Sequence, residues 1–177
     1  MFINRKPKKK GQVWIETVTY TLIAFVLIGL ILAFVKPKID ELQDKALIDQ
    51  SINVLKQIDF VINEVYNEGV GNKRAVEIII REGSFTFNST NNSISFFFEG
   101  KYMYSEPGIG YKEGSFDVLT TKVGSTYKVL VKKEYPNFNF TYFDKENSKT
   151  LSKSTTAYEI FVSNKGGSSQ IMDFSIK

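Results

Sequence analysis

The sequence contains no cysteine and no histidine. The chain therefore has no disulfide and no thiolate nucleophile, and it lacks the imidazole groups that serve as general bases and as ligands of most zinc and iron sites. No nucleophile is paired with a base, and the acidic residues show no regular calcium-ligand spacing. We therefore expect neither an enzyme nor a bound cofactor or metal. Glycines at positions 108, 110 and 114 lack the strand and helix that flank a nucleotide loop, and they predict a turn.

Net positive charge is confined to the N-terminus. The formal net charge is +4, but five of the 23 basic residues lie within the first eleven positions, which leaves 18 basic against 19 acidic residues in the rest of the chain. The five are Arg5, Lys6, Lys8, Lys9 and Lys10. The basic character belongs to a terminal tail, and we do not expect the body of the protein to bind nucleic acid.

An apolar run follows this tail from Val13 to Val35, and Glu16 is its only charged residue. As a helix, these 23 residues reach about 34 Å, enough to cross a hydrocarbon core of roughly 30 Å. Five cations precede the run, whereas both signs of charge follow it at positions 36–41. The positive-inside rule then places the N-terminus in the cytoplasm and the C-terminal part outside.

Helical spacing continues beyond the apolar run. Pro37 is expected to kink or locally break the helix, and Gly69 and Gly71 are stop signals. Between them, residues 36–68 predict an amphipathic helix whose apolar stripe packs against a sheet. The stripe consists of Ile39, Leu42, Ala46, Ile48, Ile52, Leu55, Ile58 or Asp59, Ile62 and Val65.

From residue 72 onward the apolar period changes from about 3.6 to two, which predicts half-buried antiparallel strands. The alternating segments are 76–80, 94–98, 127–131, 138–142, 158–162 and 172–176. The 15 Phe and 9 Tyr residues suit such a β-rich core. Residues 164–167 are expected to turn a hairpin, and 144–156 to form a polar loop with or without a short strand. The predicted fold class is α+β: a long N-terminal hydrophobic helix followed by an antiparallel β-sheet or sandwich over residues 72–177.

The junction between the basic tail and the apolar run reads Lys8-Lys9-Lys10-Gly11-Gln12-Val13-Trp14-Ile15-Glu16. This junction resembles the class III signal peptides of archaeal type IV pilins and their relatives. In that family a membrane peptidase cuts after a glycine that follows basic residues, and the mature chain begins with Gln, any residue, Ser, any residue and Glu. Gln12 and Glu16 match this pattern, whereas Trp14 stands in place of the serine. The resemblance covers residues 8–35 by motif and the remainder by architecture only.

The resemblance implies that a prepilin peptidase cuts between Gly11 and Gln12. Residues 1–11 would be removed, and residues 12–35 would remain as the membrane helix and later as the filament core. The implied partners are the peptidase, an assembly ATPase with its membrane platform, membrane lipid before assembly, and other pilin subunits. Glu16 would pair with the new α-amine of Gln12 on a neighbouring subunit and so set the register; alternatively, it lies charged at the headgroup level.

Two further sets of residues are candidates for packing and modification. Gly29 and Ala33 have the small-xxx-small spacing that permits close helix approach. Three Asn-X-Ser/Thr sequons make Asn88, Asn91 and Asn139 candidate glycosylation acceptors in the predicted outer domain. We expect Asn88 and Asn91 in a turn, and Asn139 pointing outward because it alternates with apolar neighbours.

The sequence thus favours a structural subunit, a major or minor pilin, of an archaeal type IV pilus-like surface filament. Such a chain would first be a single-pass membrane protein with a cytoplasmic N-terminus. The alternative is a membrane-anchored surface receptor or adhesin that keeps an uncut signal anchor and never polymerises. A secretion pseudopilin and an archaellum filament subunit share the overall plan, and nothing in the sequence identifies what the β-domain would touch.

Overall fold

The computed structural model describes residues 10–167 and 169–177, with the backbone alone for residues 10–12. The leader predicted at residues 1–11 therefore lies almost wholly outside the described residues. The chain divides into two compact units, one ending at Asp40 and one running from Glu41 to Lys177. Each unit is described by itself below.

One helix, α1, spans Lys10–Glu68 and includes Pro37. The helix does not break at Pro37, although this proline has no N–H to bond to the carbonyl of Ala33. α1 ends where predicted: Gly69 and Gly71 follow it with φ of 94° and 90°, a left-handed conformation that glycine adopts at little cost.

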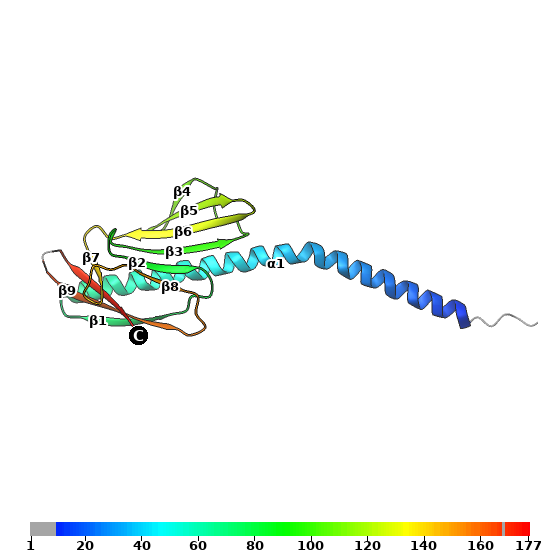
Figure 1. Ribbon diagram of the computed structural model, residues 1–177, viewed down its shortest axis with the longest axis horizontal. Coiled ribbons are helices and arrows are strands. Elements are labelled where there is room, and N and C mark those ends of the chain that lie inside the picture. Colours follow the sequence, from blue (N-terminus) through cyan, green and yellow to red (C-terminus); the bar gives the residue numbers. More distant parts are fainter. Residues whose placement is uncertain (1–9, 168) are drawn as a thin grey trace, which may run out of the picture. The chain divides into compact units, whose positions relative to one another are not determined.

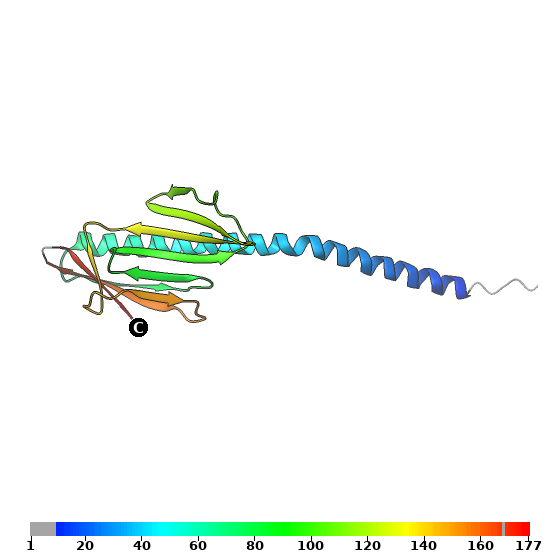
Figure 2. The same ribbon diagram turned by 45° about the horizontal axis from the view of Figure 1, so that its top comes forward.

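Ten strands follow α1 and form two sheets (Figure 1 and, in a turned view, Figure 2). They are β1 Lys73–Ile78, β2 Ser84–Asn88, β3 Ser93–Gly100, β4 Gly110–Glu113, β5 Phe116–Val123, β6 Thr126–Glu134, β7 Asn139–Tyr142, β8 Lys149–Ser152, β9 Tyr158–Gly166 and β10 Ile171–Ile176. One sheet has four strands in the order β1-β9-β10-β7, and the other has six in the order β4-β5-β6-β3-β2-β8. The α+β class is confirmed.

The alternating segments predicted as strands correspond to β1, β3, β6, β7, β9 and β10, although β1 ends at Ile78 and Ile80 lies beyond it. One pairing differs from the prediction: β7 and β10 run parallel. The turn predicted at residues 108–114 is partly wrong, because Gly110 begins β4. The hairpin between β9 and β10 is confirmed, but Asn164 lies within β9 and the connection follows Gly166.

Three strands, β2, β4 and β5, were not predicted. The alternation in β5 is masked because one of its core-facing positions is Thr120, which is fully buried. Its hydroxyl lies 2.6 Å from that of Ser105, so the buried polar group is satisfied. β8 occupies part of the segment predicted as a polar loop.

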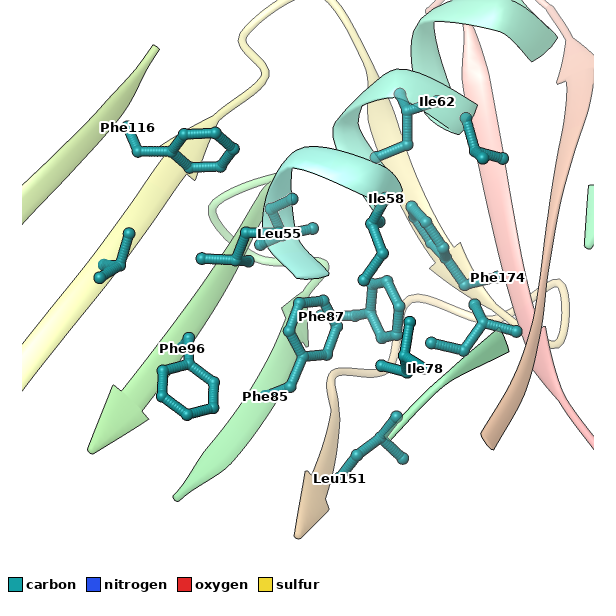
Figure 3. Packing of buried hydrophobic residues seen from close by; sticks show 14 of the residues in the cluster. Leu55, Ile58, Ile62, Ile78, Phe85, Phe87, Phe96, Phe116, Leu151 and Phe174 are labelled. Carbon is teal, nitrogen blue, oxygen red and sulfur yellow. The ribbon is translucent and has the colours of Figure 1, made fainter. Parts of the chain in front are cut away.

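The core of the second unit lies between the buried stripe of α1 and both sheets. The stripe residues from Ile48 to Val65 are buried, as the helical spacing predicted, whereas Ile39, Leu42 and Ala46 are exposed. Figure 3 shows the side chains of α1 pointing toward phenylalanines of both sheets. The rings of Phe87 in β2 and Phe174 in β10 lie 4.3 Å apart between centroids, so the two sheets also contact each other directly.

Truncation of this stripe is expected to destabilise the β-domain strongly. Leu55 is fully buried, so Leu55→Ala should lower the free energy of unfolding by about 2–5 kcal/mol. Phe60, on the same helix, is 61% exposed and gives a matched control. Phe60→Ala should change the free energy of unfolding by about 0.5 kcal/mol or less. Urea unfolding of the full chain in detergent measures both values, and equal losses would contradict the packing described.

Candidate functional site

The first half of α1 is a candidate site because its large apolar side chains are exposed. Every residue from Val13 to Ile39 is exposed, and Trp14, Phe25 and Phe34 reach 71%, 70% and 77%. Side chains of this kind are normally buried, and a continuous exposed apolar surface marks a membrane or protein contact. Among the described residues, α1 is the one helix that is long and apolar enough to cross a membrane. It is compatible with a single-pass anchor.

The threonine hydroxyls in the first turns of this segment are satisfied within the helix. The hydroxyls of Thr17, Thr19 and Thr21 donate to the carbonyls four residues earlier, at 2.9, 2.9 and 2.8 Å. Hydroxyls bonded in this way do not need water, so they can enter lipid or a helix bundle at low cost.

The predicted cleavage and assembly residues lie at the start of α1. Gly11 and Gln12 have helical backbone, and their side-chain surroundings are outside the described residues. Glu16 is exposed and lies one helical turn after Gln12. The pairing of Glu16 with an α-amine of another subunit remains a prediction.

Gly29 and Ala33 are both uncovered within this chain. A Cβ placed on Gly29 would meet no atom within 4 Å, and Ala33, one turn later, is exposed. Because both residues are small, a second helix can approach α1 closely at this position.

The three sequon asparagines differ in their local structure. Asn139 is exposed in β7 between Phe138 and Phe140, which are 8% and 2% exposed, so its predicted outward direction is confirmed. Asn91 lies in the turn after β2, as expected. Asn88 instead is the last residue of β2, and its Oδ1 accepts hydrogen bonds from the amides of Thr90 and Asn91 at 2.9 and 3.1 Å.

The fold brings the sequon regions together, which the sequence did not indicate. Residues of the turn after β2 and of β7 line one cleft of about 350 Å³, together with Glu146. The Oδ1 of Asn92 accepts a hydrogen bond from the amide of Phe140 at 2.9 Å, which fixes the turn against the strand. Asn139 lines this cleft, and Asn91 lies in the turn that forms its wall.

A second cluster, around Asp59, was also missed. The Oδ1 of Asp59 accepts from Lys133 Nζ at 2.6 Å, from Tyr135 Oη at 2.7 Å and from Asn63 Nδ2 at 3.2 Å. Burial, followed by the interactions with Asp59, raises the pKa of Tyr135, so its hydroxyl remains a donor. The only sequence signal was that Asp59 adjoins the apolar stripe.

No family model, curated protein or solved structure matched the chain. The architecture of one long apolar N-terminal helix followed by β-sheets is compatible with a pilin-like chain.

Proposed function

We propose that this chain is a structural subunit, a major or minor pilin, of an archaeal type IV pilus-like surface filament. The observation that carries the proposal is the contrast along α1. From Ile48 the helix buries its apolar stripe in its own β-domain, whereas from Val13 to Val35 every side chain is exposed in the part of the chain that the structure describes. Each large apolar side chain left in water costs about 1.5–3 kcal/mol relative to burial, so this segment requires lipid or other copies of itself.

On the proposed route, lipid covers this segment first and other copies of the chain cover it later. The precursor enters the membrane, a prepilin peptidase cuts between Gly11 and Gln12, and an ATPase-driven machine moves the subunit from lipid into the filament. Lipid is as apolar as a helix bundle, so the hydrophobic effect alone does not drive this transfer. Close packing at Gly29 and Ala33 and pairing of Glu16 supply the specific interactions.

Filament composition tests the proposal. Filaments sheared from native cells should contain this chain, and deletion of its gene should remove a class of surface filaments or reduce their number. Expression of the chain from a plasmid should restore them. If the chain stays monomeric in the membrane and deletion leaves all filaments unchanged, the anchored receptor or adhesin is the better account, because lipid alone then covers the helix.

We further propose that Asn91 and Asn139 carry glycans, since both are exposed in the outer domain. Peptides that contain either residue should appear with added hexose-type mass when native protein is digested and analysed. Asn139→Gln should remove the added mass from its own peptide and leave that of Asn91 unchanged. Unmodified masses for both peptides in native protein would contradict this proposal.

A further inference from the structure

Lys133 lies on the core-facing side of its strand. Along β6, Val129 and Val131 are buried, and Lys133 continues this alternation opposite the fully buried Ile94 of β3. Its ammonium group therefore points inward, where Asp59 of α1 meets it at 2.6 Å. Lysine rarely occupies such a position unless it is paired.

The pair is sheltered from water. The side chains of Asp59 and Lys133 are 16% and 19% exposed, and Tyr135 is 5% exposed. The Lys133 nitrogen lies 5.1 Å from the ring centre of Tyr135 and 5.8 Å from that of Phe116. By contrast, the Lys153–Glu82 pair has the same 2.6 Å separation, but its side chains are 63% and 45% exposed.

The cluster holds the parts that amide formation requires. The amine of Lys133 is a potential nucleophile, and the carboxyl carbon of Asp59 is its electrophile. The Tyr135 hydroxyl and the Asn63 amide both donate to Asp59 Oδ1, so they are placed to stabilise negative charge on that oxygen, as an oxyanion hole does. In general, well-oriented intramolecular reactants reach effective concentrations of about 10⁵–10⁸ M, so contact between the two groups favours condensation.

We propose that Lys133 and Asp59 form an intramolecular isopeptide bond that joins β6 covalently to α1. A proton first passes from the ammonium to the carboxylate across their 2.6 Å contact, giving an amine and a carboxylic acid. The Lys133 nitrogen attacks Cγ of Asp59, a C–N bond forms, and Oδ1 takes up the negative charge beside Tyr135 and Asn63. Oδ2 then leaves as water with its own proton and one from the nitrogen as the C–O bond breaks. The products are one secondary amide and one water molecule, and no oxidant or reductant is needed.

Because the chain has no cysteine, it cannot form a disulfide, and this bond would supply a covalent cross-link instead. It joins residues 74 positions apart, from the helix that would transmit a pulling force in a filament to the centre of the six-stranded sheet. The inference concerns the folded domain alone, so it stands or fails separately from filament assembly.

The intact mass of the denatured full chain, purified in detergent, tests the proposal directly. We expect a mass lower by one water molecule than the sequence gives for the observed N-terminus. Digestion should yield one branched peptide that contains both Asp59 and Lys133. The full sequence mass, together with separate Asp59 and Lys133 peptides, would overturn the proposal.

Three variants sharpen the test. Lys133→Arg keeps the positive charge but cannot form the amide, so it should show the full mass, and Asp59→Ala should do the same. Lys153→Arg, at the exposed control pair, should still lack one water. If Lys133→Arg also lacked one water, the bond would not involve Lys133 and the assignment would be wrong. Should a variant fail to fold, the mass of the unaltered chain still decides.

Tyr135→Phe separates the positioning role of the hydroxyl from the packing of the aromatic ring. The variant keeps the buried ring and loses only the donor to Asp59. We expect the uncross-linked form to accumulate, visible as a second peak at the full mass that decreases over time. Complete cross-linking at the rate of the unaltered chain would remove Tyr135 from the proposed oxyanion site.

Discussion

Replacement of Glu16 with alanine is expected to leave membrane insertion and leader cleavage intact and to abolish filament assembly. Glu16 is the single acid of the apolar run, and alanine only makes the helix easier to insert. In the proposed filament, however, Glu16 pairs with the Gln12 α-amine of a neighbour in a water-excluded bundle. Removal of one partner from such a pair costs about 3–5 kcal/mol, which is more than a hundredfold in the association constant at about 1.4 kcal/mol per factor of ten.

The measurement is the amount of this chain in sheared filaments relative to the membrane fraction, with cleavage followed by mass. Thr21→Ala is the matched control. It removes a polar group from the same helix, but that hydroxyl bonds to the carbonyl of Thr17 in its own helix, so assembly should be normal. Unchanged filament yield from the Glu16→Ala strain would show that this acid does not set the register, and the headgroup interpretation of Glu16 would replace it.

Replacement of Gly11 with phenylalanine is expected to block cleavage and to leave the uncut precursor in the membrane. The peptidase implied by the resemblance accepts a glycine before the cut, and a large aromatic side chain there would occupy space that the enzyme needs for the scissile bond. With the basic tail retained, the cations before Val13 would have to enter the bundle, at about 2.5–3.5 kcal/mol for each charge near mid-membrane. Cells should therefore also lose the filaments.

Gly29→Leu separates cleavage from packing. It introduces a bulky residue into the same helix, far from the junction, so the leader should be removed normally even though close helix approach at Gly29 is prevented. Precursor and mature forms differ by the eleven-residue leader and are resolved on a gel. Efficient processing of Gly11→Phe would mean that the cut lies elsewhere or does not occur.

The helix and its division into two halves could be predicted from the sequence because each half has its own strong pattern. The run from Val13 to Val35 is apolar all round, and the stripe from Ile48 to Val65 follows the helical period. The strands β3 and β6 could also be predicted, because their core-facing residues are apolar over 94–98 and 127–131. β5 could not, because Thr120 interrupts its core-facing set, and its burial depends on a partner, Ser105, that only the fold provides.

The candidate sites likewise divide into those with a local sequence motif and those that only the fold assembles. Gly11, Gln12 and Glu16 form a local motif that can be read along the chain. The cluster around Asp59 cannot be read in this way, since Asp59 and Lys133 are 74 residues apart and each alone resembles an ordinary surface charge. Likewise, Asn139 lines one cleft with the turn after β2 only because β7 packs beside that turn. Such sites depend on long-range packing, which no local period encodes.

The N-terminal peptide of the protein from native membranes and filaments tests the central claim most directly. Chemical labelling of α-amines before digestion, followed by mass analysis, identifies where the mature chain begins. We predict a labelled peptide that begins at Gln12 in both fractions, which would establish removal of the leader with retention of the apolar helix. A labelled peptide that begins within the first few residues would contradict the account, and the chain would then be an uncut signal-anchored surface protein.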